Sequence, residues 1–279
     1  MVLAMLGACA TSSSIHLAAP SGAPARAPLP AKVLPSSRVT PSALKPTVRP
    51  GIDTGGAKPT PSGPGSDGVP LNGSGSFSVS PGGTAVVGDP AATRVTYVTE
   101  VEKGIAWGSN PVWTPTRFAA TVDAIIAGPR GWTASNAHPI TDHSQGITNG
   151  SWSFQRVSGG HFNVKILLAT PGTTDRLCGT AGLRTLGQYS CRYGNTMVIN
   201  LRRWLRGAPG FAMSLDGYHT MVINHEMGHR LGFDHMLCPG RGQPAPVMQE
   251  ETIDLAGCVP NAYPFAANGT FITGPWASS

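Results

Sequence analysis

Three histidines and a glutamate between residues 225 and 235 have the types and the spacing of a metal-dependent hydrolase. His225 and His229 are four residues apart, so on a helix both imidazoles lie on one face and can bind a single ion. Glu226 is turned by about 100° from His225 on such a helix, which places its carboxylate beside the ion rather than on it. Gly232 can adopt a positive φ and lets the chain leave the helix sharply, so that His235 arrives as a third ligand. Three neutral imidazoles with an open fourth position are typical of a catalytic zinc site, with Glu226 as the general base.

A simpler interpretation of these residues is an amphipathic helix that packs two histidines into a core. That interpretation explains neither Gly232 nor the third histidine, so we expect a zinc site. Four other histidines show no ligand spacing, and we expect them at surface or loop positions: His138, His143, His161 and His219.

The run His-Glu-Met-Gly-His-Arg-Leu-Gly-Phe-Asp-His at 225–235 resembles the metzincin peptidases, whose motif is H-E-x-x-H-x-x-G-x-x-H followed by a methionine turn. The resemblance implies that Met248, in Ala245-Pro246-Val247-Met248, is the methionine beneath the metal. A methionine that fills a core gap is the alternative interpretation of Met248, but its distance from His235 favours the turn. Some metzincins direct a tyrosine at the oxyanion. Tyr263 could take that role, although we favour a partly buried structural tyrosine.

Further motifs lie on both sides of this run: Leu177-Cys178-Gly179, Ser190-Cys191, Val198-Ile199-Asn200-Leu201 with Arg203-Trp204, and Cys238-Pro239 leading to Pro246-Val247-Met248. With them, the chain from residue 93 onward resembles a family of exported actinobacterial domains of unknown function. It is also distantly similar to small secreted neutral metallopeptidases of the same bacteria. Those enzymes use an aspartate where this chain has His235, and Asp234 stands one residue too early for that role. The resemblance therefore supports the zinc site and leaves the substrate open.

Composition divides the chain near residue 92. Residues 10–92 are rich in Pro, Gly, Ala, Ser and Thr and have almost no aromatic residues, so we predict a disordered, partly polyproline linker. Residues 93–279 hold nearly all the aromatic residues and are long enough for one domain with a substantial core. Residues 1–9 resemble a secretory leader that ends in a lipobox, which would make Cys9 a lipidated N-terminus. A chance cysteine in an ordinary leader is the alternative.

The chain has 20 Lys and Arg residues against 14 Asp and Glu residues, a formal net charge of +6. The basic residues are scattered singly and do not form a clustered face with interleaved aromatic residues, so we expect no nucleic-acid partner. No stretch of about 20 apolar residues is present, so we expect no transmembrane helix and membrane contact only through a lipid on Cys9. These features predict a protein of the cell exterior or envelope.

The four cysteines after residue 93 form an even set in a chain that is expected to be exported, and three pairings are possible. We favour Cys178 with Cys191 and Cys238 with Cys258, because each pair brackets a Gly-rich or Pro-rich loop. A cysteine-based zinc site is the alternative. It is disfavoured because no C-x-x-C pair is present.

Hydrophobic periodicity predicts two main helices and four strands. One helix starts at Thr114 and ends before Gly128-Pro129, and the other spans 214–231 with Ser214 or Asp216 as its N-cap and Gly232 as its C-cap. The predicted strands are 94–100, 151–157, 162–169 and 195–201. Ser158-Gly159-Gly160 could join the second and third strands as a hairpin. The Gly-rich residues 172–194 are expected to be irregular.

This order of elements predicts an α+β fold of the zincin or metzincin type, with a mixed twisted sheet and a coil-rich C-terminal subdomain. The function that we expect is a zinc endopeptidase acting on a peptide or protein substrate. One alternative is another zinc hydrolase of the cell envelope, such as a peptidoglycan amidase. A second is a non-catalytic adhesion or scaffold domain stabilised by zinc, against which Glu226 argues because a structural site has no need of that carboxylate. Nothing in the sequence separates the first two functions.

Overall fold

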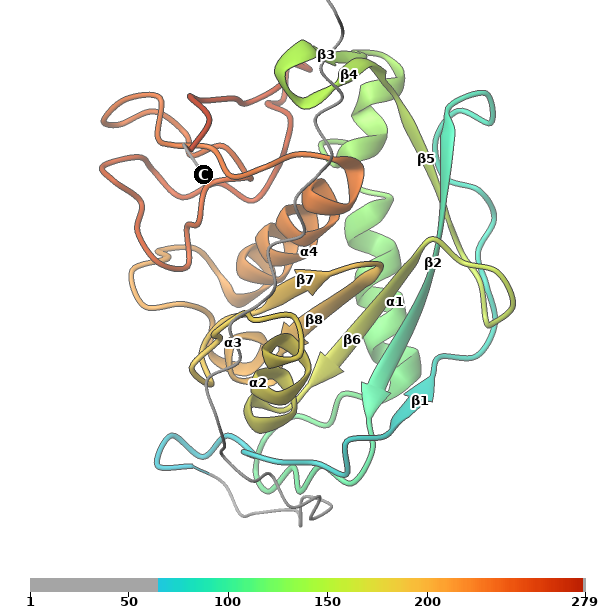
Figure 1. The fold of residues 1–279 in the computed structure, drawn as a ribbon, viewed down its shortest axis with the longest axis vertical. Helices are drawn as coiled ribbons and strands as arrows, with labels where there is room; N and C mark the ends of the chain where they lie inside the picture. Colours follow the sequence, from blue (N-terminus) through green and yellow to red (C-terminus); the bar gives the residue numbers. More distant parts are fainter. Residues whose placement is uncertain (1–64, 278–279) are drawn as a thin grey trace, which may run out of the picture. The chain divides into compact units, whose positions relative to one another are not determined.

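The longest strand, β2 (Thr93–Glu102), pairs with three other strands of a mixed six-stranded sheet (Figure 1). The computed structural model that shows this sheet describes residues 65–277. The strand order is β1-β2-β6-β8-β7, and β5 also pairs with β2. The other strands are β1 (Phe77–Val79), β5 (Trp152–Arg156), β6 (Val164–Ala169), β7 (Cys191–Tyr193) and β8 (Thr196–Asn200).

Two strands, β5 and β6, pair with β2 in parallel, each along one part of its length. The first half of β2 pairs with β5, ending at Tyr97 opposite Arg156, and the second half pairs with β6, starting at Tyr97 opposite Val164. Because Tyr97 has both partners, β5 and β6 lie on opposite sides of β2. The hairpin predicted at residues 158–160 is therefore wrong. The short connection between β5 and β6 crosses from one side of β2 to the other and does not reverse direction. Both strands run parallel to β2, and they pair with different halves of it.

Helices cover both faces of the sheet (Figure 1). Ile166 and Leu168 of β6 belong to the larger hydrophobic core, whereas the alternating Leu167 and Ala169 belong to a smaller cluster on the other face. The larger core also contains residues of α1 (Pro115–Ile126), α3 (Leu201–Arg206) and α4 (Leu215–Leu231), and the smaller one contains Cys178 of α2 (Pro171–Gly179). Two 3-10 turns and a hairpin complete the elements: η1 (Trp132–Asn136), β3 (Ile140–Asp142), η2 (His143–Gln145) and β4 (Ile147–Gly150).

The domain is mixed α+β, and the two long helices and four strands predicted from periodicity are present. The prediction that residues 172–194 are irregular is wrong, because this segment contains most of α2 and all of β7. The buried residues of α2 include Thr173, Thr174 and Cys178 rather than large apolar side chains. Such a face leaves no hydrophobic period to detect.

The domain begins well before residue 93. Phe77 of β1 pairs with Glu102 of β2, and Val69 is completely buried. The prediction of a disordered linker is therefore wrong for residues 65–92. Residues 10–64 lie outside the described part of the chain, as do residues 1–9 with Cys9.

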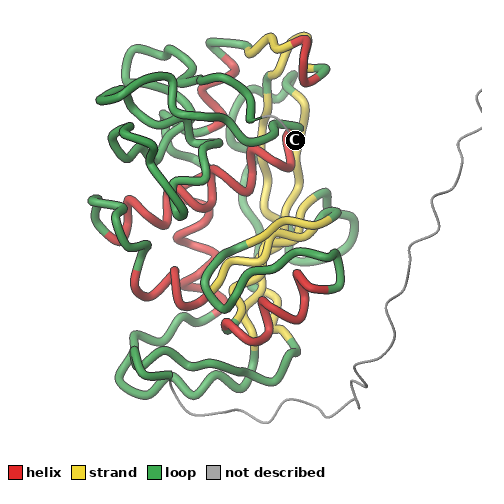
Figure 2. The backbone as a smooth tube through the Cα atoms, turned by 60° about the vertical axis from the view of Figure 1, so that its left-hand side comes forward, coloured by secondary structure: helices red, strands yellow, loops and turns green. Residues whose placement is uncertain are grey.

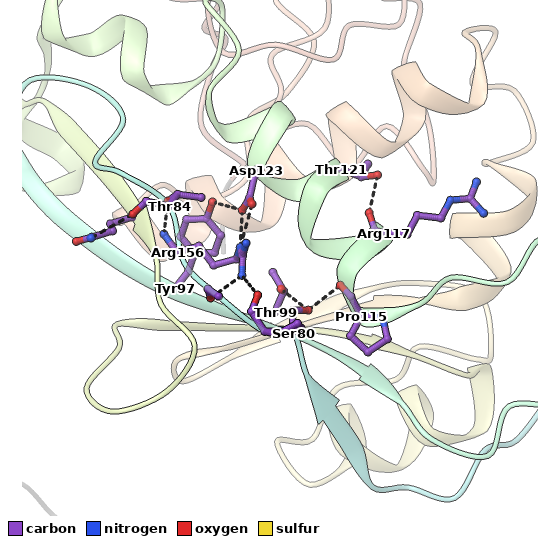
Figure 3. Close-up of polar contacts among 12 residues, drawn as sticks. Ser80, Thr84, Tyr97, Thr99, Pro115, Arg117, Thr121, Asp123 and Arg156 are labelled. Atoms are coloured by element: carbon purple, nitrogen blue, oxygen red, sulfur yellow. Dashed lines mark hydrogen bonds and ion pairs between the residues drawn. The ribbon is translucent and has the colours of Figure 1, made fainter.

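A buried polar network around Arg156 explains why the composition of the sequence predicts a domain start at residue 93, which is too late (Figure 3). The Arg156 guanidinium donates to the carbonyl oxygens of Pro81 at 3.0 Å and Gly82 at 2.9 Å. The same group donates to the carboxylate of Asp123 in α1 at 2.9 Å. Hydrogen bonds from the folded core thus hold a segment that has few apolar side chains of its own.

Two disulfides have the predicted pairing. Cys178 and Cys191 join α2 to β7 with a Cα–Cα distance of 6.3 Å, and Cys238 and Cys258 join two loops with a distance of 5.8 Å. These bonds contradict the alternative of a cysteine-based zinc site and are consistent with an extracellular or envelope location. Among the described helices, none has the length and apolar character to cross a membrane. After Leu231 the described chain runs in loops, drawn green in Figure 2.

Candidate metal centre

Helix α4 carries His225 and His229, and both of its ends are capped. The Ser214 hydroxyl accepts a hydrogen bond from the Gly217 amide at 3.1 Å, which decides between the two predicted N-caps. Gly232 ends the helix with φ of 105°, a left-handed conformation that glycine adopts at little cost. This turn brings the chain back toward α4 within three residues.

The three imidazoles converge on one point. Nε2 of His229 lies 3.2 Å from Nε2 of His225 and 3.1 Å from Nε2 of His235. Neighbouring ligand nitrogens of a tetrahedral zinc ion stand about 3.3 Å apart when the Zn–N distance is about 2.0–2.1 Å. The spacing therefore suits one ion. Among residues 65–277, no other group of three potential ligands lies so close together.

Backbone carbonyls fix the tautomers of two of these rings. Nδ1 of His225 donates to the oxygen of Val247 at 2.8 Å, and Nδ1 of His229 donates to the oxygen of Phe233 at 2.8 Å. Both Nε2 atoms are then free of protons, and their lone pairs face each other. Burial lowers the pKa of His225 well below its usual value, and burial together with His235 lowers the pKa of His229 to about 4. Neutral rings with converging lone pairs are the arrangement that a cation stabilises.

Glu226 stands beside the imidazoles without a partner. It is 5% exposed, and within the described chain its carboxyl group forms no hydrogen bond or ion pair. Burial raises the pKa of Glu226 to about 8, and the positive charge of Arg192 in β7 opposes this rise. Glu226 lines the same cavity as the three histidines, so this carboxyl group is available to a small molecule that enters it.

The turn at Val247 and Met248 connects the segments that carry the three histidines. The backbone oxygen of Val247 accepts the hydrogen bond from His225. The backbone oxygen of Met248 accepts a hydrogen bond from the backbone N–H of Met236, the residue after His235, at 3.0 Å. The Met248 side chain is completely buried and packs against Gly228 of α4. The structure thus makes Met248 a core residue and also places it against the helix that carries His225 and His229.

Residues 62–259 match a protein family described as Protein of unknown function (DUF3152). The chain belongs to the DUF3152 family. No curated protein and no solved structure gives a significant match to it. The matched range holds the histidine triad, Met248 and all four disulfide cysteines. It also begins far upstream of residue 93, as the ordered segment before β2 does.

The histidine triad of this DUF3152 domain lines a cavity of about 430 Å³. The edge strand β7, helix α4 and residues 249–253 form much of its wall. Charged residues that the sequence analysis does not select also line it, and Arg192 and Glu251 are two of them. Neither could have been found from spacing, because β7 and the loop after Met248 are brought to α4 only by the tertiary fold.

Other candidate residues lie away from this cavity. Tyr263 is not among the residues that line it, and the Arg130 guanidinium stands 4.1 Å from its ring centre, so the structural interpretation of Tyr263 is the better one. His219 is buried and stacks on Trp204 with ring centres 3.7 Å apart, so its expected surface or loop position is wrong. The remaining three histidines are exposed as expected: His138, His143 and His161.

Proposed function

We propose that this chain is a zinc-dependent peptidase of the zincin type that acts outside the cytoplasm. One observation carries the proposal: three imidazole nitrogens converge in an open cavity that the unpartnered carboxyl group of Glu226 also lines. A structural zinc site is closed by four protein ligands, whereas a catalytic site keeps one position open. The lipid anchor on Cys9 stays a prediction.

The residues of the centre divide the chemistry among them. When bound, zinc would supply a Lewis acid that polarises a carbonyl group and lowers the pKa of water to about 7. Glu226 takes the proton from the attacking water and delivers it to the leaving nitrogen. The carbonyls of Val247 and Phe233 hold two of the imidazoles in the tautomer that presents Nε2 to the metal. Arg192 favours the ionised form of Glu226, which a general base requires.

The position of β7 favours a peptide as substrate. This strand is at the edge of the sheet, and its residues Cys191 and Arg192 line the cavity. An edge strand has backbone N–H and C=O groups that are free to pair with an extended chain. A peptide bound in this way would run along the cavity past Glu226 and the histidine triad.

A peptide-library cleavage assay tests the proposal. Purified, zinc-loaded protein is incubated with the library alone, with 1,10-phenanthroline, or with the non-chelating 1,7-isomer as a matched control. We expect cleavage that the chelator stops, that the isomer leaves intact, and that added zinc restores. Absence of cleavage by zinc-loaded protein, or cleavage that survives chelation, would contradict the proposal.

A further inference from the structure

Glu251 is a carboxyl group that the fold buries without a charged partner. The residue is 3% exposed, and its Oε2 accepts one hydrogen bond, from the backbone N–H of Asn261 at 3.0 Å. Its Oε1 is buried and has no hydrogen-bond partner within the described chain. A buried acceptor of this kind lowers the stability of a fold, so its presence calls for an explanation in terms of function.

The chain holds this carboxyl group in a fixed place. The Asn261 side chain donates to the carbonyl oxygens of Ala245 at 2.8 Å and Tyr263 at 2.7 Å, so the residue that binds Oε2 is itself locked. The amide of Glu251 donates to the carbonyl oxygen of Gln249 at 2.7 Å. Its orientation is therefore built into the loop that follows Met248.

A second unpartnered acceptor lies in the same wall. Gln249 is 4% exposed, and its side-chain amide donates to the carbonyl oxygen of Asp254 at 3.0 Å, which leaves its Oε1 buried and without a partner. Both Gln249 and Glu251 line the cavity that contains the metal centre. The two arginines that also line the cavity, Arg184 and Arg192, form no ion pair with Glu251.

We infer that Glu251 and Gln249 form a subsite that binds a basic group of the substrate, an ammonium or a guanidinium. The inference rests on the proposed peptidase function and adds its substrate preference. Ammonium and guanidinium groups carry several N–H donors and no acceptor, so one such group has enough donors for both orphan oxygens. A cation also favours the ionised form of a carboxyl group whose burial otherwise raises its pKa to about 9.

Other occupants of this subsite fit less well. A hydroxyl group has one hydrogen to donate and could satisfy only one of the two acceptors. A calcium ion takes six to eight oxygen ligands, far more than these two side chains offer. Two acceptors, one of which can ionise, match a substrate cation better than either.

Binding to a protein that cannot turn over tests the subsite separately from catalysis. The zinc-loaded Glu226→Gln protein is titrated by calorimetry with the peptide acetyl-Ala-Ala-Lys-Ala-Ala-amide and with its norleucine counterpart. Norleucine has the same carbon chain and lacks the charge, and either peptide can slide to place its central side chain in the subsite. We expect the lysine peptide to bind at least about tenfold more tightly, the usual scale of a hydrogen bond to a charged group.

Three further variants in the Glu226→Gln background identify the residue responsible. Glu251→Gln should abolish the preference for lysine, and Glu251→Met should reverse it in favour of norleucine, a gain that misfolding cannot produce. Glu250→Gln removes an exposed carboxylate from the same wall and should keep the preference. Affinity ratios are compared throughout, because Glu250 lies 3.9 Å from His235 and could change absolute affinities.

The outcomes separate the two proposals. Equal affinity for the two peptides, no measurable binding of either, or a lysine preference that survives Glu251→Gln would overturn the subsite. A lysine preference that depends on Glu251, in a protein whose wild-type form cleaves no peptide, would support the subsite and contradict the peptidase function.

Discussion

The sulfur of Met248 occupies the space where a side chain on Gly228 would stand. A Cβ atom built on Gly228 would collide with Met248 Sδ and also with the indole of Trp132. Gly228 directly precedes His229, and Met248 directly follows the residue that binds His225. The close approach of these two residues therefore sets the distance between α4 and the turn that orients His225.

Gly228→Ala should destabilise the fold and weaken zinc binding. Alanine favours a helix by about 1 kcal/mol over glycine, but overpacking costs about 1–3 kcal/mol and should outweigh this gain. Urea unfolding and a zinc titration measure the two effects. Gly179→Ala in α2 is the matched control, because its Cβ would meet no atom within 4 Å. Equal stability of the two variants would show that the contact with Met248 is not tight.

His229→Ala should remove most of the zinc. The wild-type protein should hold one ion per chain, and the variant loses the imidazole whose Nε2 lies within 3.2 Å of both other ligand nitrogens. Elemental analysis after dialysis gives the zinc content. His161→Ala, which removes an exposed histidine outside the triad, should keep its zinc. Full occupancy in His229→Ala would place the ion elsewhere.

The parts of the structure that could be predicted are those that depend on residues close in sequence. The three histidines of the triad and Glu226 lie within residues 225–235, so helical geometry and one glycine turn suffice to bring them together. Arg192 and Glu251 reach the same cavity through sheet pairing and a long loop, and no spacing rule predicts that contact. The order of β5, β2 and β6 escaped prediction for the same reason, because strand pairing is a non-local property.

A version of the chain that starts at residue 93 should be less stable than one that starts at residue 62. The shorter version lacks β1 and the buried Val69, and Arg156 loses the carbonyl oxygens of Pro81 and Gly82. We expect its melting temperature to fall by at least about 5 °C, which corresponds to the loss of one or two kcal/mol in a domain of this size. Scanning calorimetry of both versions provides the comparison. Equal melting temperatures would mean that the segment before β2 contributes nothing to stability.

The stability of the protein should depend on pH through Glu251. Its ordinary pKa of 4.5 rises to about 9 on folding, so between these values the folded state binds more protons than the unfolded chain. The contribution of Glu251 to the free energy of unfolding is fully present below about pH 4.5 and falls as the pH rises toward 9. Glu251→Gln, which cannot ionise, should therefore be more stable than wild type at pH 8 by on the order of 1 kcal/mol or more.

Urea unfolding of both proteins in chelator, at pH 4 and at pH 8, measures this difference. At pH 4 the carboxyl group is protonated in both states, so the two proteins should have similar stability. Glu250→Gln is the matched control, because it removes an exposed carboxylate from the same loop. A stability difference that is the same at both pH values would show that Glu251 keeps its ordinary pKa in the folded protein.

Glu226→Gln should keep the fold and the zinc and lose nearly all turnover. Glutamine has almost the shape of glutamate, and the carboxyl group of Glu226 forms no hydrogen bond or ion pair with the described residues, so the helix and the three imidazoles should stay in place. The amide cannot accept a proton from water or deliver one to the leaving nitrogen. General acid-base catalysis contributes about 100- to 10,000-fold, and a loss of that order is expected.

The measurement pairs zinc content with the rate of peptide cleavage in wild type, Glu226→Gln and His235→Ala. His235→Ala should lose zinc and activity together, because it removes a ligand, whereas Glu226→Gln should lose activity alone. A Glu226→Gln protein that retains more than about a tenth of wild-type turnover at full zinc loading would have a different base, since the retained rate is far above the expected acid-base loss. A scaffold domain stabilised by zinc would show no cleavage in any of the three proteins, so the wild-type rate decides between catalyst and scaffold before the variants are compared.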